Sequence, residues 1–260
     1  MPMTIIVCIK QVLSVDSPVR VRADGAWIEE DQAAWEMNEA DAYALEAALR
    51  LKETHGGEVV VVSAGPERAT QVIREALARG ADRGVLVTGE HLSLADPVAV
   101  ARALAQAIRT ESPDLVLTGL QSDDLGSAQV GVVLADKLGF PHATIVMQAE
   151  CADGRIRAKR ELEGGWFQWV SMQMPAVLTI QSGINQLRYA TLKGIMGAKK
   201  KTVRVLVVDV AEVQAGQRIV AMRIPKPNKA ARLFEGTPVE CAHALVAALR
   251  AESRIPGAQS

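Results

Sequence analysis

The chain has 260 residues, of which 23% are charged, and its formal net charge is -1 at pH 7. Because this balance gives no overall attraction to nucleic acid or to a membrane surface, we expect neither as a partner. No apolar run approaches the roughly 20 residues that span a bilayer. The three cysteines, Cys8, Cys151 and Cys241, form no close pair and no metal-ligand spacing. These features predict a reduced protein of the cytoplasm or an equivalent matrix compartment, without a metal site.

The first 150 residues alternate between short apolar runs and helical patterns. The apolar runs predict strands at 4–9, 59–63, 85–88, 115–117 and 142–147. The segments between them predict helices at 39–55, 67–79, 97–110 and 130–138. Strands that alternate with helices in this way require right-handed crossovers and a parallel sheet with helices on both faces. The predicted fold class is therefore α/β, with a doubly wound and mostly parallel sheet.

Two local patterns concern the segment before and at the first helix. The sequence VRVRADGAWIEE, residues 19–30, places Asp24 and Gly25 between alternating segments, which predicts a small β-hairpin. Asn38 is expected to be the N-cap of the helix, with Asp41 at the third helical position as its reciprocal partner.

The stretch LVLTGLQSDDLGSAQVGVVLADKLGFP, residues 115–141, joins a buried strand to a helix through a polar loop. Backbone N–H groups at the start of such a helix favour a phosphate. The loop residues that bring N–H groups and short side chains there are Gly119, Ser122, Asp123, Asp124, Gly126, Ser127 and Gln129. Any strand, loop and helix connection needs similar residues for its turn, and the two aspartates would repel a phosphate lying directly over them. They would instead fix the loop or accept bonds from ribose hydroxyls.

In a parallel sheet of this kind, ligands bind beyond the carboxyl ends of the strands, near the point where the strand order reverses. Three loops are expected to meet there, namely 8–11, 64–66 and 119–129. Their convergence strengthens the prediction of a nucleotide site.

After residue 150 the expected strands are shorter and more polar, at 155–160, 166–170, 176–180 and 203–208. Between the last two lies a glycine-punctuated segment, 183–201, with few secondary-structure cues. It carries isolated apolar residues beside a basic cluster: Leu187, Tyr189, Leu192, Ile195 and Met196. Such a segment forms either a local satellite core capped by solvated lysines or a surface that presents a hydrophobic anchor inside a positive rim.

The C-terminal residues before the final helix contain few apolar side chains that could form a core. Residues 211–228 are rich in Gln, Pro and Lys, and 224–237 have the character of an arm. A final helix over 238–252 has one apolar face. We therefore expect a nucleotide-binding domain at 1–210 and an arm with a helix at 211–260, which docks on this domain or on a partner subunit.

The region RELEGGWFQWVSMQMPAVLTIQSGINQLRYATLKGIMGAKKK, residues 160–201, resembles the signature region of the β subunit of electron transfer flavoproteins. The resemblance extends over nearly the whole chain through VCIKQ, MNEADAYALEAALRLKE, VVSAGPE, ALARGADRGV and LTGLQSDD. The RELEGG and MNEAD segments resemble most the bacterial branch that serves methylamine-type dehydrogenases.

This resemblance implies a heterodimer in which an α subunit holds most of the FAD site. The present chain would have an adenine-nucleotide α-hydrolase-like fold and hold AMP. The adenine and ribose side would be lined by Cys8, Met37, Asn38, Asp41 and Ala64. The phosphate would meet the loop and helix start formed by Gly119, Gln121, Ser122, Asp123, Asp124, Gly126, Ser127, Ala128, Gln129, Val130 and Gly131.

The resemblance also implies an electron carrier without catalytic side chains, since the flavin carries the electrons. Leu192 aligns with the recognition-loop leucine that inserts into partner dehydrogenases, supported by Tyr189, Ile195 and Met196. The electrons would pass to a downstream quinone reductase or another acceptor, and the C-terminal arm would wrap the α subunit.

One departure from the family pattern leaves alternatives open. Many relatives have Asn-Gln-Thr at the helix start where this chain has Ala128, Gln129 and Val130, although Ser127 could supply a hydroxyl. This sequence pattern also resembles the electron-bifurcating branch, in which a second FAD replaces AMP and NADH is a substrate. A third alternative is a stand-alone nucleotide-binding or stress-type regulatory domain of the same fold.

Overall fold

The computed structural model describes residues 2–89, 92, 96–208, 216–217, 219–225 and 231–252. The chain divides into two compact units, Met1–Met222 and Arg223–Ser260. Parts of the predicted arm, residues 211–215 and 226–230, lie outside the described residues. Among the residues that are described, no helix is both long enough and apolar enough to cross a membrane.

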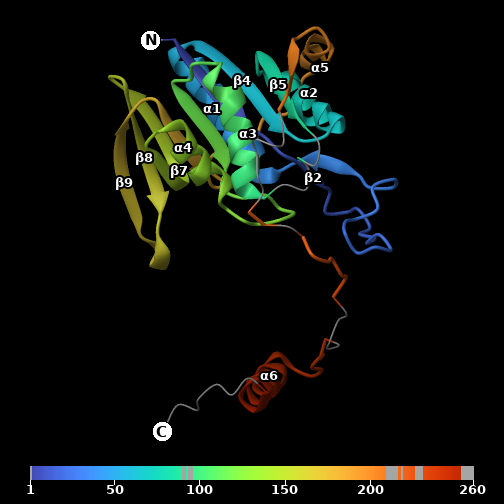
Figure 1. The fold of residues 1–260 in the computed structure, drawn as a ribbon. Coiled ribbons are helices and arrows are strands. Elements are labelled where there is room, and N and C mark those ends of the chain that lie inside the picture. Colours follow the sequence, from blue (N-terminus) through green and yellow to red (C-terminus); the bar gives the residue numbers. More distant parts are fainter. Residues whose placement is uncertain are drawn as a thin grey trace. The chain divides into compact units, whose positions relative to one another are not determined.

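The first unit is built on a large sheet, shown in Figure 1. Within the described residues the sheet has nine strands in the order β11-β5-β4-β1-β6-β10-β7-β8-β9. Their bounds are β1 Met3–Cys8, β4 Gly57–Ala64, β5 Arg83–Thr88, β6 Leu115–Gly119, β7 His142–Ala152, β8 Arg155–Glu161, β9 Phe167–Gln173, β10 Ala176–Ile180 and β11 Val203–Val207. The strands from β11 to β7 run parallel, and β8 and β9 continue the sheet as antiparallel strands. The predicted α/β class and its mostly parallel sheet are confirmed.

Helices cover both faces of the sheet, because its central strands are apolar on both sides. One face packs against α1 (Glu39–His55), α2 (Thr70–Arg79) and α5 (Leu192–Ala198). The other face packs against α3 (Pro97–Arg109) and α4 (Val130–Leu138). A short antiparallel pair, β2 (Gln11–Leu13) and β3 (Trp35–Met37), lies outside the main sheet. The two hydrophobic clusters therefore form separate layers on either side of the sheet.

Three local expectations differ from the structure. The turn at Gly25 is present, but the pairing expected for a hairpin over 19–30 is reduced to one isolated bridge, Val21 with Ile28. The segment 183–201 contains a regular helix, α5, which its glycines did not predict. The strand predicted at 142–147 continues to Ala152, because its second half pairs with the antiparallel β8.

The capping box predicted at the start of α1 is wrong. Asn38 does precede the helix, but its side chain makes no capping hydrogen bond to it. A capping box exists instead in the second unit, at α6 (Pro238–Glu252). There the Glu240 carboxylate accepts from the Thr237 N–H at 2.8 Å, and the Thr237 hydroxyl accepts from the Glu240 N–H at 3.4 Å. The reciprocal pattern is thus used where no distant loop competes for the side chains.

Candidate functional site

A cavity lies at the carboxyl ends of β1, β4 and β6, where the strand order reverses on either side of β1. The three loops that follow these strands contribute to its walls, together with the start of α4 and residues from the segment 27–41. The loops expected to meet at this edge of the sheet therefore do meet. The residues that line it include Cys8, Lys10, Gln11, Trp27, Trp35, Asn38, Asp41, Ala64, Arg68, Thr118, Gly119, Ser122, Asp124, Gln129, Val130 and Gly131.

Asp41, on the first turn of α1, joins the ends of two neighbouring strands. Its Oδ2 accepts from the Lys10 N–H at 2.7 Å and its Oδ1 from the Gly119 N–H at 2.9 Å. Burial raises the pKa of Asp41 to about 7, although these two N–H groups oppose the rise. Burial, and then the nearby Asp41, also raise the pKa of the Cys8 thiol far above its ordinary value. Cys8 is therefore an unreactive apolar wall of the cavity.

Asn38 fixes the loop after β6 rather than the helix that it precedes. Its Nδ2 donates to the Gln121 carbonyl at 3.0 Å, and its Oδ1 accepts from the Asp123 N–H at 2.9 Å. Asp123 in turn accepts from the Glu39 N–H at 3.0 Å. The start of α1 and the loop after β6 are thus held together by reciprocal bonds.

Lys10 places a positive charge at the cavity. Its ammonium donates to Asp124 at 2.6 Å and to the Ser122 hydroxyl at 3.3 Å. Asp124 is paired with this ammonium, and Asp123, which accepts the N–H of Glu39, does not line the cavity.

The start of α4 approaches the sheet very closely. A Cβ on Gly131 would lie 2.5 Å from Thr179 Cγ2 and 2.7 Å from Thr118 Oγ1, so only glycine allows this approach. Gln129 makes no side-chain cap, and the first N–H groups of a helix have no acceptor within it. Val130 and Gly131 line the cavity at this end. The site therefore offers backbone donors and the positive end of a helix dipole to an anion.

The opposite wall is aromatic. The Arg68 guanidinium lies 3.8 Å from the centre of the Trp35 ring and donates to Glu30 at 3.0 Å. Gln11 donates to the Arg68 carbonyl at 3.1 Å. Gln11 Oε1 and Arg68 Nε are both buried and have no hydrogen-bond partner among the described residues.

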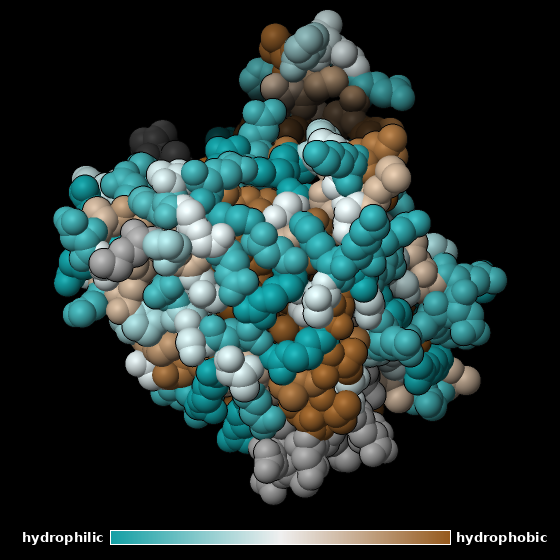
Figure 2. Space-filling view, turned by 90° about the horizontal axis from the view of Figure 1, so that it is seen from above, coloured by the Kyte–Doolittle hydropathy of each residue, from teal (hydrophilic) through white to brown (hydrophobic). Residues whose placement is uncertain are grey.

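A second feature of the first unit is an apolar surface on and beside α5. Tyr189 is 95% exposed, Leu192 76%, Ile195 48% and Met196 64%. Most of the face seen in Figure 2 is hydrophilic, with hydrophobic areas between. Lys193, Lys199 and Lys200 are also exposed, so the four apolar side chains have a basic surround. We call these four residues the α5 surface.

Comparison with known protein families shows to which family the chain belongs. The sequence model described as "Electron transfer flavoprotein domain" matches residues 26–211. The chain belongs to the electron transfer flavoprotein family. A relative from Methylophilus methylotrophus named "Electron transfer flavoprotein subunit beta" is 38% identical over 256 residues, covering 94% of this chain and 97% of the relative. Relatives of the same name from Sus scrofa (35%; 96% and 98% covered) and Bacillus subtilis (34%; 92% and 95% covered) are also similar.

Most of the predicted nucleotide-site residues line the cavity. Those that line the cavity are Cys8, Asn38, Asp41, Ala64, Gly119, Gln121, Ser122, Asp124, Ser127, Ala128, Gln129, Val130 and Gly131. Three do not line it. Met37 is buried in the core, Asp123 bonds to Glu39 and Asn38, and Gly126 closes a turn on the Ser122 carbonyl.

Sequence reasoning missed the residues that line the cavity from outside the three loops, above all Trp27, Trp35 and Arg68. Two tryptophans in an otherwise polar segment were the available signal, but the pairing of Trp35 with Arg68 joins positions far apart in the chain. Within the described part of the chain, no group of three or more His, Cys, Asp or Glu side chains could hold a metal ion.

Proposed function

We propose that this chain is the β subunit of a heterodimeric electron transfer flavoprotein of the cytoplasm. It holds AMP in the cavity and docks dehydrogenases through the α5 surface. FAD, held mostly by the α subunit, carries the electrons to a downstream quinone reductase or another acceptor. The observation that carries this proposal is the cavity at the ends of β1, β4 and β6, with the start of α4 in its wall.

The chemistry of the cavity fits a nucleotide. The first N–H groups of α4 are free to receive a phosphate, and Gly131 keeps the helix close to the sheet. The ammonium of Lys10 is paired with Asp124 in the same loop, so this carboxylate does not repel a phosphate. Gln11 adds a polar side chain to the cavity wall. Cys8 and Ala64 supply apolar wall beside it.

No side chain of this chain is required to make or break a bond. FAD supplies the redox chemistry when it is bound, and the chain contributes binding and orientation. In this proposal Asp41 and Asn38 act by shaping the cavity, since their polar atoms are engaged with Lys10, Gly119 and the loop after β6.

The α5 surface has the composition of a transient docking site. A central aliphatic anchor, Leu192, lies among Tyr189, Ile195 and Met196 within a basic surround. Its charge suits a partner with an apolar pocket rimmed by carboxylates. We also propose that residues 211–260 wrap the α subunit, and that the RELEGG and MNEAD segments place the chain near the branch that serves methylamine-type dehydrogenases.

A second candidate is the β subunit of an electron-bifurcating flavoprotein, which binds a second FAD and uses NADH. The observation that favours it is the pair of aromatic side chains, Trp27 and Trp35, in the cavity wall. A flavin ring is the kind of flat, apolar group that such a wall accepts.

The test is to produce the chain with its α subunit, denature the complex and identify the released nucleotides by chromatography and mass. One FAD and one AMP per heterodimer is the expected result. Two FAD and no AMP would replace the proposal by the bifurcating one. A complex that releases no adenine nucleotide from this chain would contradict both.

Docking is tested separately with Leu192→Ala and a dehydrogenase purified from the same cells by its ability to reduce the complex. Removing a central anchor costs at least about 2 kcal/mol, so KM for the complex should rise roughly thirtyfold with nucleotide content unchanged. Leu162→Ala, which also truncates an exposed leucine, is the control. An unchanged KM in Leu192→Ala would rule out the docking role.

A further inference from the structure

The residues between β10 and α5 form turns and irregular backbone instead of a strand or helix. Hydrogen bonds nevertheless attach them firmly to α1. Asn185 donates to the Tyr43 carbonyl at 3.1 Å, and the Gln186 carbonyl accepts from Arg50 at 2.8 Å. Arg188 makes the most extensive of these attachments. We define residues 181–198, which comprise this connection and α5, as the presenting segment.

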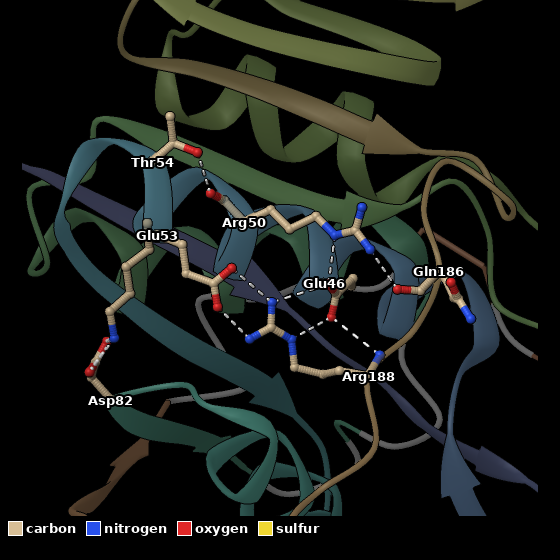
Figure 3. A network of polar contacts seen from close by, with 8 residues as sticks. Glu46, Arg50, Glu53, Thr54, Asp82, Gln186 and Arg188 are labelled. Carbon is tan, nitrogen blue, oxygen red and sulfur yellow. Dashed lines mark hydrogen bonds and ion pairs between the residues drawn. The ribbon is translucent and has the colours of Figure 1, made fainter.

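Arg188 lies between two carboxylates of α1, as Figure 3 shows. Its Nε and Nη2 donate to Glu46 at 2.7 and 3.2 Å, and its Nη1 and Nη2 donate to Glu53 at 2.6 and 3.2 Å. The N–H of Arg188 also donates to Glu46 at 3.4 Å. A guanidinium that bridges two carboxylates fixes both position and orientation, because its donors form a planar fork.

This ion pair differs from an ordinary surface pair because Glu46 is nearly buried. Only 4% of its side chain is exposed, and Arg50 donates to its other oxygen at 2.7 Å. Burial opposes the charge of Glu46, but the hydrogen bonds from Arg188 and Arg50 outweigh burial and hold its pKa below the ordinary value. Breaking the pair would leave a charge in a poorly solvated place.

The far side of the presenting segment is attached to α2. The Thr191 hydroxyl caps α5 by accepting from the Gly194 N–H at 3.1 Å. Arg74 of α2 donates to the carbonyls of Ala198 and Lys201, both at 2.7 Å. The ammonium of Lys201 donates to the Leu77 carbonyl at 3.0 Å. The segment is therefore held by α1 at its beginning and by α2 at its end.

Such attachments are needed because α5 cannot hold its own shape. A helix of seven residues is too short to be stable alone in water, and it contains Gly194 and Gly197. Its outward side chains, Leu192 and Met196, are 76% and 64% exposed and therefore contribute little packing that would order the helix. Tyr189, directly after Arg188, is almost fully exposed.

We infer that Arg188 is the positioning residue of the docking site, holding the presenting segment on α1 so that Tyr189 and Leu192 project in one fixed arrangement. This inference rests on the docking role proposed above. A segment ordered before the encounter loses less conformational entropy when it binds. Arg188 itself need not touch the dehydrogenase.

The chain contains a matched control for this arginine. Arg83 also bridges two glutamates, Glu58 and Glu111. The side chains of Arg83 and Arg188 are 32% and 31% exposed, and each has one nearly buried partner, Glu111 at 7% and Glu46 at 4%. Arg83, however, connects β5 to β4 and to the turn after α3, and its two glutamate partners belong to neither α1 nor the presenting segment. Arg83→Lys and Arg188→Lys each keep the charge but lose the fork.

The experiment compares these two variants and the parent in the full heterodimer, by hydrogen exchange with mass spectrometry and by transfer kinetics with the dehydrogenase used for Leu192→Ala. In Arg188→Lys, the amides of Gly194 and Ile195 should exchange about tenfold faster, and KM should rise about tenfold with kcat and nucleotide content unchanged. Arg83→Lys should leave the exchange of these amides and KM at the parent values.

Unchanged exchange in α5 of Arg188→Lys would overturn the inference, as would an equal rise of KM in both variants. The docking proposal fails separately. If Leu192→Ala keeps the parent KM, the docking proposal itself is wrong. If Leu192→Ala raises KM as expected but Arg188→Lys keeps the parent KM, only the positioning role of Arg188 is ruled out.

Discussion

Asp41 and Gly119 fit each other so closely that no other residue can replace the glycine without moving the aspartate. The Gly119 N–H donates to Asp41 Oδ1 at 2.9 Å, and a Cβ on Gly119 would lie 2.4 Å from the same oxygen. Since Asp41 also holds the end of β1 through Lys10, this contact sets the distance between two loops of the cavity.

Gly119→Ala should therefore damage both stability and the cavity. Overpacking of this kind costs about 1–3 kcal/mol, because Asp41 must leave its place between the two strand ends. We expect a lower denaturation midpoint and less nucleotide released from the purified complex. Gly65→Ala is the control for stability, since its Cβ would make only an ordinary contact of 3.6 Å with Ala69. Equal stability of the two variants would contradict the prediction.

The raised pKa of Asp41 predicts a pH dependence of stability. Because the folded state raises this pKa from 3.8 to about 7, the protonated form favours folding. The stabilisation is complete below pH 3.8 and is lost progressively as the pH rises through about 7.

Urea unfolding measured between about pH 4 and pH 7 checks this, because the slope of stability with pH follows the proton difference between the two states. The free energy of unfolding of the parent should fall across this range more steeply than that of Asp41→Asn, which cannot titrate. Glu46, Asp96 and Glu111 have lowered pKa values, so their protonation changes stability at more acid pH. Parallel slopes in the two proteins would show that Asp41 is ionised throughout.

Asp96 connects α3 to the beginning of the C-terminal segment. Its Oδ1 caps α3 through the Ala99 N–H at 2.7 Å, and its Oδ2 accepts from the N–H groups of Gly216 and Gln217 at 2.5 and 2.9 Å. Asp96→Ala should lower stability by about 1–2 kcal/mol through loss of the cap and should expose residues 216–222 to proteases.

Asp96→Asn separates these two effects, because its amide oxygen can still cap α3 while its NH₂ group faces the donors of Gly216 and Gln217. We expect near-parent stability with faster cleavage after residue 216, measured by limited proteolysis and mass. Cleavage at the parent rate in both variants would mean that Asp96 does not anchor this segment.

Gly194 allows α5 to lie directly on α2. A Cβ at this position would be 2.3 Å from the Ala78 carbonyl oxygen, whereas a Cβ on Gly197 would meet nothing within 4 Å. Gly194→Ala should push α5 outward and raise KM for the dehydrogenase about tenfold, in line with a loss of roughly 1.4 kcal/mol. Gly197→Ala, in the same helix, should keep the parent KM. Similar behaviour of the two variants would refute the packing argument.

The sequence predicted the sheet because the evidence for it is local. Apolar runs such as 59–63 and 115–117 mark strands buried on both faces, and the loops that follow parallel strands meet at one edge. For this reason the loops after β1, β4 and β6 could be assigned to a common site before the strand order was known.

The errors concern residues whose partners are distant in the sequence. Asn38 and Asp41 have the spacing of a capping box, but the loop at 119–123 competes successfully for their polar atoms. Helix α5 was missed because its glycines oppose a helix, and the contacts that hold it come from Arg74 and Arg188. The aromatic wall was missed because Trp35 and Arg68 meet only in three dimensions.

The position of β10 has a consequence for how the chain is made. β10 lies between β6 and β7, although it is synthesised after both and after the hairpin of β8 and β9. Until residues 176–180 leave the ribosome, β6 has an open apolar edge that another strand could pair with. We therefore expect nascent chains that end before residue 176 to aggregate or to need a chaperone, and chains that extend past residue 180 to aggregate less because this edge of β6 is paired.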